Sequence, residues 1–414
     1  MNQIIDKSLA NKRIISMVAA MTVCVIAGFG YAWSVLQTPI VKTLGLSEMD
    51  VSLTFTITIV LSTLAPLVFG KWISKRRTRQ VILLGGMLMG FGLFLTAYVK
   101  SAFMLYITYG VIAGLGVGFV YPCIMAYAVK LFPDSQGIAS GLMAAAYGSG
   151  AVIWAPVAIK IIQSTSLGGA FKILGVIFML LIAFLSIFIM DIPENLMGEK
   201  FHENEGLEGI KGSYSVRNLR RGEMVRTAMF YVMIITFTFG TTSGLMIIGQ
   251  ASPILQQSVG LNETKAAVFV GIFALCNTLG RFLWGIISDR IGKFSVMLLL
   301  FIITAFSMAM IAILGSSPII IIFMALTAAS YGGFATIITP LTADVFGRKY
   351  VTENYGLMYM VFGLASLIGP RVAVFFKTLN QGSYINAFIV AMAMSILGCF
   401  FALYIKKAQA AKIK

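Results

Sequence analysis

Charged residues are scarce in this sequence. Only 11% of its 414 residues are Asp, Glu, Lys or Arg, whereas 59% are hydrophobic. Because about a quarter of the residues of a soluble globular domain are charged, this shortage excludes an ordinary soluble protein. Apolar runs of about 20 residues, the length that crosses the hydrocarbon core of a bilayer, recur along the chain. The sequence therefore predicts an all-α polytopic membrane protein.

Residues that bind metals or act as nucleophiles are also rare. The chain has one histidine, His202, in a polar segment, and four cysteines inside apolar runs, which are Cys24, Cys123, Cys276 and Cys399. Their spacing matches neither a disulfide framework nor a metal site, and no cluster of His, Asp, Ser and Cys suggests a catalytic centre. We therefore expect free thiols, no metal or other cofactor, and no enzymatic activity.

Acidic residues are half as numerous as basic ones, 15 against 31, which gives a net charge of +16. The basic residues do not alternate with aromatic ones as in single-strand binders, so we expect no nucleic acid partner. They cluster at Lys7, Lys12 and Arg13, at Lys71, Lys75, Arg76, Arg77 and Arg79, at Arg217, Arg220, Arg221 and Arg226, at Arg348 and Lys349, and at Lys406, Lys407, Lys412 and Lys414. Short connections rich in Lys and Arg stay cytoplasmic, so both termini are predicted to be cytoplasmic.

Twelve apolar runs are long enough to span a bilayer. They cover residues 14–39, 49–70, 80–98, 102–130, 136–162, 169–190, 227–256, 264–287, 295–314, 317–343, 354–376 and 383–404. The first run is longer than the core of a signal peptide and lacks a small-x-small cleavage site, so we interpret it as a membrane span.

One long polar segment, residues 191–226, separates six runs from six. We interpret it as a cytoplasmic linker loop between an N-terminal six-helix bundle, residues 1–190, and a C-terminal six-helix bundle, residues 227–414. Two such bundles around a central substrate site are typical of transporters.

The two halves also repeat each other. "GKWISKRRTR" begins at Gly70 and "GIISDRIGK" begins at Gly285. A second matching pair of segments is "ASGLM", which contains Gly141, and "NYGLM", which contains Gly356. Both pairs of glycines are 215 residues apart. A constant offset of this kind indicates an internal duplication.

The segment "GIISDRIGK" resembles the loop signature of the major facilitator superfamily, and the first-half copy has Ser74 at the acidic position. The resemblance implies that Gly285, Asp289 and Arg290 belong to a conformational latch on the inner side of the membrane. Because a serine cannot replace the acid, the resemblance implies that the latch of the first half is weaker, or is built from Arg76 and Arg77 with other partners.

Four further segments resemble the oxalate/formate antiporter family and, more distantly, the bacterial and animal monocarboxylate transporters. They are "GFGYAWSVLQTPI", "KLFPDSQGIASGLMAAAYGSG", "LGRFLWGIISDRIGK" and "ENYGLMYMVFG". The resemblance implies the major facilitator fold, with twelve transmembrane helices in two pseudo-symmetric six-helix bundles. It also implies a monomeric secondary active transporter of small organic anions in the inner membrane of a prokaryote.

Arg281 lies in the middle of an apolar run, two turns before Asp289. An arginine at the centre of a membrane helix costs roughly 2.5–3.5 kcal/mol on insertion scales, so it usually faces protein or a wet cavity. Its guanidinium can bind a carboxylate through two parallel hydrogen bonds, and the resemblance implies that it binds the substrate. The alternative is a structural arginine that bonds backbone carbonyls or extends toward the membrane surface.

Two neighbouring positions refine this hypothesis. Asn277 is one turn before Arg281 and on the same face, where it can steady the guanidinium or bind substrate; animal monocarboxylate transporters often carry an aspartate there. Phe362 stands where the resembling oxalate exchanger has a lysine. One cation beside an aromatic ring suits a monoanion with an apolar tail, so we expect lactate or pyruvate to be preferred over oxalate.

Five tyrosines lie on helices that line the pathway in the resembling transporters. They are Tyr31, Tyr121, Tyr147, Tyr331 and Tyr359. A tyrosine ring offers an apolar wall and a hydroxyl donor, so we predict that they contact the substrate; the alternative is that they pack or anchor the membrane interface. A second cation in an apolar run, Arg371, is predicted to lie near the outer surface, as an anchor or gate-rim residue or as a substrate contact.

The coupling ion is the least determined feature. Arginine stays protonated at physiological pH, and no carboxylate lies deep within a predicted helix. The resemblance to monocarboxylate carriers favours proton symport, and anion exchange is the alternative. A drug/proton antiporter normally needs a buried acid, and a receptor without transport usually carries a soluble signalling domain; this sequence has neither.

Overall fold

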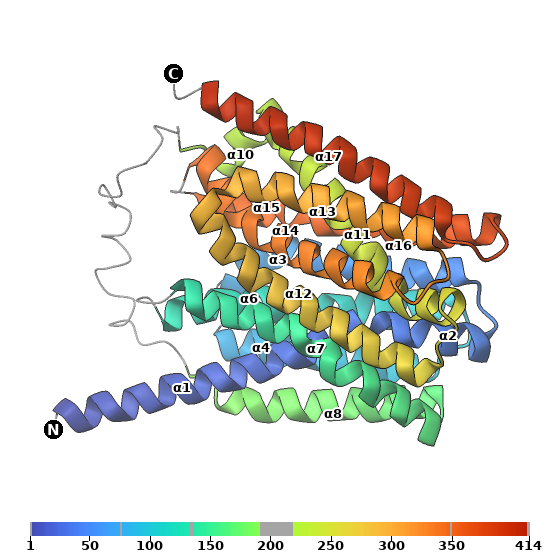
Figure 1. Ribbon diagram of the computed structural model, residues 1–414. Coiled ribbons are helices and arrows are strands. Elements are labelled where there is room, and N and C mark those ends of the chain that lie inside the picture. The colour runs from blue at the N-terminus through green and yellow to red at the C-terminus, as the bar shows by residue number, and fades with distance from the viewer. Residues whose placement is uncertain (1, 75–76, 133–135, 191–217, 348–349, 412–414) are drawn as a thin grey trace.

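The computed structural model describes residues 2–74, 77–132, 136–190, 218–347 and 350–411, which are almost entirely helical (Figure 1). Twelve of the helical segments are long and apolar enough to span a membrane. The prediction of an all-α polytopic membrane protein with twelve spans is therefore confirmed. Most of the predicted linker, residues 191–217, together with His202, lies outside the described residues.

The first six spans make up what we call the first half. Its elements are α1 (Asn2–Ala27), η1 (Gly28–Ala32), α2 (Trp33–Leu44), α3 (Glu48–Ser74), α4 (Thr78–Thr96), α5 (Ala102–Leu105), η2 (Tyr106–Ala113), α6 (Gly114–Leu131), α7 (Gln136–Ser164) and α8 (Leu167–Ile187). The first span comprises α1, η1 and α2, and the fourth comprises α5, η2 and α6.

The last six spans make up the second half. A short helix, α10 (Arg221–Met224), precedes them, and the spans are α11 (Ala228–Ser258), α12 (Glu263–Ile291), α13 (Lys293–Leu314), α14 (Ile320–Phe346), α15 (Val351–Met358) with α16 (Met360–Leu379), and α17 (Ile385–Ala411). Across the boundary between the halves, α7 packs against α12, α3 against α16 and α2 against α11. In Figure 1 the first half, blue to green, lies below the second half, yellow to red.

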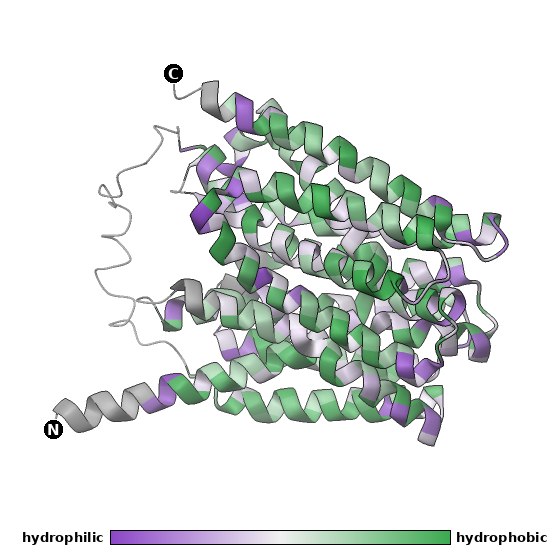
Figure 2. Cartoon of the chain, in the orientation of Figure 1, coloured by the Kyte–Doolittle hydropathy of each residue, from purple (hydrophilic) through white to green (hydrophobic). Residues whose placement is uncertain are grey.

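The two ends of the bundle differ. α1 begins and α17 ends at the same end of the molecule (Figure 1); we call this the terminal end and the opposite one the far end. Hydrophobic residues cover the long helices, and hydrophilic residues gather near both ends (Figure 2). This pattern is what a bundle needs when its middle faces hydrocarbon.

Three spans that the sequence predicts as regular helices are interrupted; in the fourth, predicted over 102–130, Tyr106–Ala113 form a π-helix, η2. The first, predicted over 14–39, changes to a 3-10 helix at Gly28–Ala32 and then continues to Leu44. The eleventh, predicted over 354–376, is broken at Tyr359, between α15 and α16. Mid-helix irregularities often mark functional positions, and those of the first and eleventh spans contain Tyr31 and Tyr359.

Candidate functional site

Arg281 lies in the middle of α12 and faces the boundary between the two halves. Its Nη2 donates a hydrogen bond to the Tyr31 hydroxyl at 3.1 Å, and its Nε donates to Asn277 Oδ1 at 3.4 Å. Tyr31 belongs to the first half and Asn277 to the second. The guanidinium is therefore held by side chains of both halves, and these bonds go to side chains rather than to backbone carbonyls.

A glycine on the neighbouring helix fixes this stretch of α12. A Cβ atom on Gly332 of α14 would lie 2.2 Å from the Asn277 carbonyl oxygen and 2.9 Å from the Arg281 nitrogen, so only glycine allows the two backbones this contact. One turn further along α14, the Thr336 hydroxyl donates to the Arg281 carbonyl at 3.0 Å. The position of Arg281 is thus fixed by direct contact between the backbones of α12 and α14.

Close packing also positions Tyr31. A Cβ atom on Gly28 would lie 2.1 Å from the Tyr147 carbonyl oxygen, so η1 contacts the backbone of α7. The Tyr31 ring then meets the Tyr147 ring edge-on, with 5.3 Å between centroids, and the Tyr121 ring lies 4.2 Å from that of Tyr147. These three tyrosines form the first-half wall of the site.

The second half supplies a matching wall. Phe362 contacts Tyr331 and Tyr359, with ring centroids 5.9 Å and 5.1 Å away. The side chains of Tyr121, Tyr331 and Tyr359 lie in the surroundings of Arg281. The structure therefore brings together all eight residues predicted to bind substrate, which are Arg281, Asn277, Tyr31, Tyr121, Tyr147, Tyr331, Tyr359 and Phe362.

Two features of the site were missed by sequence reasoning. Tyr355 lies beside Tyr359, with 5.7 Å between ring centroids, and interacts electrostatically with Arg281; it stands in the quoted segment "ENYGLM", one turn before Tyr359. The buried amide nitrogen Nδ2 of Asn277 has no hydrogen-bond partner among the described residues. A buried donor without a partner is costly, and this one lies next to the guanidinium, where an acceptor would satisfy it.

No carboxylate among the described residues forms an ion pair with this cation. Among the described parts of the chain, the ion pairs join other residues, and none includes Arg281. The positive charge is instead surrounded by phenol rings and one amide. Such a partly buried site favours an anion that can accept hydrogen bonds from several donors at once.

Comparison with known proteins agrees with the helix arrangement. The sequence profile of the Major Facilitator Superfamily matches residues 18–250 and 232–414. The chain belongs to the Major Facilitator Superfamily. It is 29% identical to the oxalate:formate antiporter of Oxalobacter formigenes over 402 residues, which cover 96% of this chain and 92% of the relative. It is 26% identical to monocarboxylate transporter 12 of Homo sapiens over 376 residues, which cover 84% of this chain and 72% of the relative.

The fold is also that of a solved superfamily transporter. A bacterial homolog of the human lysosomal transporter Spinster, in an inward-facing and unoccupied conformation, superposes with a TM-score of 0.71 over 97% of this chain and 98% of its own, at 14% identity. The predicted relation to the oxalate/formate and monocarboxylate transporters, and the predicted fold, are both confirmed.

The superfamily loop signature lies at the terminal end of α12. Asp289 and Arg290 are exposed there, and no hydrogen bond or ion pair joins either to the other half within the described ranges. A Cβ atom on Gly285 would contact the Thr336 side chain at 3.4 Å. The Ser74 side chain of the first-half signature lies outside the described residues. The latch therefore stays a prediction for a conformation in which the terminal end is closed.

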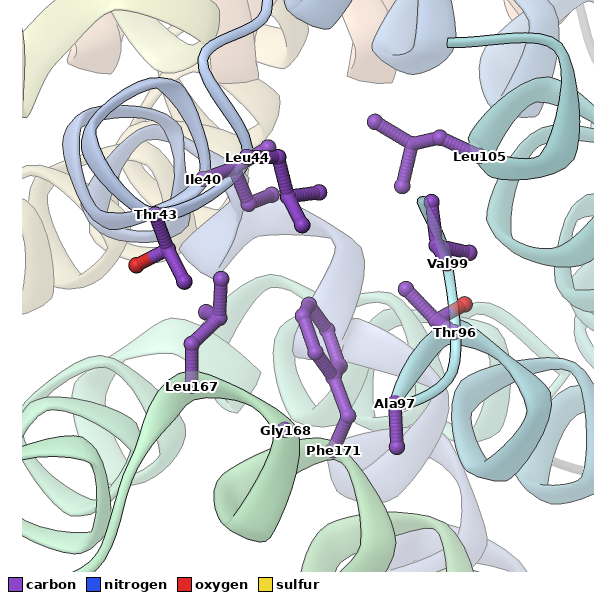
Figure 3. A pocket seen from close by; sticks show the side chains of 10 residues that line it. All are labelled: Ile40, Thr43, Leu44, Thr96, Ala97, Val99, Leu105, Leu167, Gly168 and Phe171. Atoms are coloured by element: carbon purple, nitrogen blue, oxygen red, sulfur yellow. The ribbon is translucent and has the colours of Figure 1, made fainter. Parts of the chain in front are cut away.

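Arg371 does not join the Arg281 site. It is half-buried in the far-end part of α16, and Tyr106 of the first half lies near it. A cavity of about 80 Å³ lies at the same end of the molecule, among Ile40, Leu44, Leu167, Phe171 and their neighbours (Figure 3). Its lining includes the threonines Thr43 and Thr96 but no charged side chain, so it lacks a cation that could pair with a carboxylate.

Proposed function

We propose that this superfamily member transports small monocarboxylates, such as L-lactate or pyruvate, by alternating access. The observation that carries the proposal is Arg281, a cation between the two halves that is held by a phenol and an amide and by no acid of the described residues. A substrate carboxylate would take the guanidinium in place of the Tyr31 hydroxyl. Because side chains of both halves contact the guanidinium, a substrate bound there changes the contacts of both halves, as alternating access requires.

The surrounding side chains support a single-charge substrate. Among the described residues Arg281 is the one cation of the site, and Phe362, Tyr331 and Tyr359 form an aromatic wall beside it. A dianion such as oxalate would leave one carboxylate facing aromatic rings, which is unfavourable because a charge without a partner is costly away from water. The methyl end of lactate or pyruvate fits the same wall.

The names of the relatives support the same substrate class. One is an oxalate:formate antiporter and another is a monocarboxylate transporter, so both names describe small carboxylates.

Proton symport is our proposed coupling, and anion exchange is the second candidate. Exchange is favoured by the antiporter relative, which matches 96% of this chain, and by the absence of an acid paired with Arg281 among the described residues. We further propose a monomer in the inner membrane of a prokaryote, with both termini and therefore the terminal end on the cytoplasmic side.

Transport by purified protein in liposomes tests the proposal. We expect uptake of labelled L-lactate that is lost in R281A, together with acidification of the vesicle interior. Lactate uptake that needs an internal counter-anion and moves no protons would replace symport with exchange. Faster uptake of oxalate than of lactate at equal concentration would overturn the proposed substrate class.

A further inference from the structure

Polar contacts between the two halves gather at the far end and in the middle of the molecule. Within the described ranges they are Arg281–Tyr31, Thr56–Ser366, Gln37–Gly249, Gln163–Thr264, Lys42–Glu263 and Lys377–Glu48. The last two are ion pairs, and both join the far ends of helices. Ion pairs therefore hold the two halves together at the far end.

The seam between α3 and α16 has an unusual arrangement of charge at this end. α3 begins with two acids, Glu48 and Asp50, and the last three turns of α16 carry two cations, Arg371 and Lys377. The acids belong to the first half and the cations to the second. Opposite charges thus face each other across a boundary that must open when a two-lobed carrier exposes its site to the far side.

The Glu48–Lys377 pair is partly removed from water. The Lys377 side chain is 8% exposed and that of Glu48 is 37% exposed, and the ammonium also lies over the Tyr384 ring, 5.7 Å from its centroid, within cation–π range. Burial, followed by the Glu48 carboxylate, raises the pKa of Tyr384, so its ring stays uncharged. Removing one partner would leave the other charge poorly compensated.

The other acid and the other cation of this seam, Asp50 and Arg371, both lie near the phenol of Tyr106. The Tyr106 hydroxyl donates to Asp50 Oδ1 at 2.8 Å, and the Ser47 hydroxyl donates to Asp50 Oδ2 at 2.7 Å. Arg371 lies close enough to act electrostatically on Tyr106. Asp50 is therefore anchored within the first half, and it shares Tyr106 as a neighbour with Arg371 of the second half.

A comparison pair is present on the same end. Lys42 and Glu263 also join the two halves, at 3.1 Å, but their side chains are 68% and 29% exposed. An exposed ion pair contributes little because water and salt screen it. A cavity of about 180 Å³ between these two pairs is lined by Gln37, Lys42, Glu48 and Gln257, among others, so solvent reaches Glu48 from this side.

We propose that the α3–α16 seam is the far-side gate of this carrier and that the half-buried Glu48–Lys377 pair is its main electrostatic lock. This inference rests on the alternating-access function proposed above. The gate opens when Lys377 leaves Glu48, and Arg371 and Asp50 separate with it. The exposed Lys42–Glu263 pair contributes little to the closed state.

Distance measurements between spin labels test the gate without any substrate. Labels at Lys100 and Ser316, both exposed in far-end loops of opposite halves, would report the separation of the halves in full-length protein whose native cysteines have been replaced. We expect E48Q and K377M each to raise the population of the long-distance state roughly tenfold, because a partly buried pair is worth more than an exposed one.

Two variants serve as controls. The charge swap E48K with K377E should return the distribution to within about twofold of the unmodified protein, and E263Q should change it by about twofold or less. An unchanged distribution in both E48Q and K377M, or an equal change in E263Q, would overturn the gate. Lactate-induced thermal stabilisation of the same proteins, lost in R281A, reports separately on the proposed function, so failure of one does not imply failure of the other.

Discussion

The guanidinium of Arg281 on α12 donates a hydrogen bond to the Tyr31 hydroxyl on η1, 3.1 Å away. The bond joins a cation of the second half to a phenol of the first. Tyr31 sits in a 3-10 turn that is packed on α7, and Arg281 sits in a helix packed on α14. Any relative movement of the two halves must therefore change the surroundings of the guanidinium, and the following predictions depend on that link.

Two replacements of Arg281 show whether lactate binding needs only its positive charge or also the planar arrangement of its donors. We expect R281A to weaken L-lactate binding roughly 100-fold or more, since hydrogen bonds to a charged group are worth about 1.5–3 kcal/mol each. R281K keeps the charge but loses the planar pair of donors, so we expect partial function, about tenfold weaker than the unmodified protein. Thermal-shift titration in detergent measures both; equal lactate affinity in all three proteins would remove Arg281 from the site.

Tyr31 is expected to donate to the substrate carboxylate once that carboxylate engages the guanidinium. Y31F would then raise the KM for lactate roughly tenfold, corresponding to the loss of one hydrogen bond to a charged acceptor. A lower KM in Y31F would instead show that the hydroxyl only competes with substrate for Arg281. Initial uptake rates in liposomes distinguish the two outcomes.

Phe362 is expected to set the preference for monoanions. F362K places a second cation beside Arg281, so we expect the ratio of oxalate to lactate uptake to rise at least roughly tenfold, the change given by about 1.4 kcal/mol of new ion-pair energy. F362L removes the ring without adding charge and should leave the preference for lactate intact. A similar rise in F362L would assign the preference to pocket size rather than to charge.

Gly332 is expected to be essential for placing Arg281. G332A adds a Cβ atom 2.2 Å from the Asn277 carbonyl oxygen, which forces α12 and α14 apart at a cost of about 1–3 kcal/mol, and we expect a lower melting temperature and weaker lactate binding. Gly141 on α7 has no atom within 4 Å of an added Cβ. G141A should therefore keep or slightly raise stability, and an equal loss in both variants would contradict the packing argument.

The sequence alone determined the class of the protein and the number of its spans. Charges are too expensive in hydrocarbon to be scattered along a membrane helix, so the apolar runs mark the twelve spans directly, and an isolated Arg281 is conspicuous against them. Span boundaries were less accurate: the span predicted over 14–39 continues through Pro39 to Leu44, because a proline inside a membrane helix need not end it.

Only the tertiary structure decided which residues meet. Tyr31 and Arg281 are 250 positions apart, and Glu48 and Lys377 are 329 apart. No local pattern encodes these pairs, since they arise where η1 faces α12 and where α3 faces α16. The irregular turns at Tyr31 and Tyr359 were equally invisible, because hydropathy does not distinguish a 3-10 turn or a broken helix from a regular one. Arg281 and Lys377 look alike in the sequence, since each is a cation within an apolar run or directly after one. Helix packing decides that Arg281 faces the candidate substrate site and that Lys377 faces an acid.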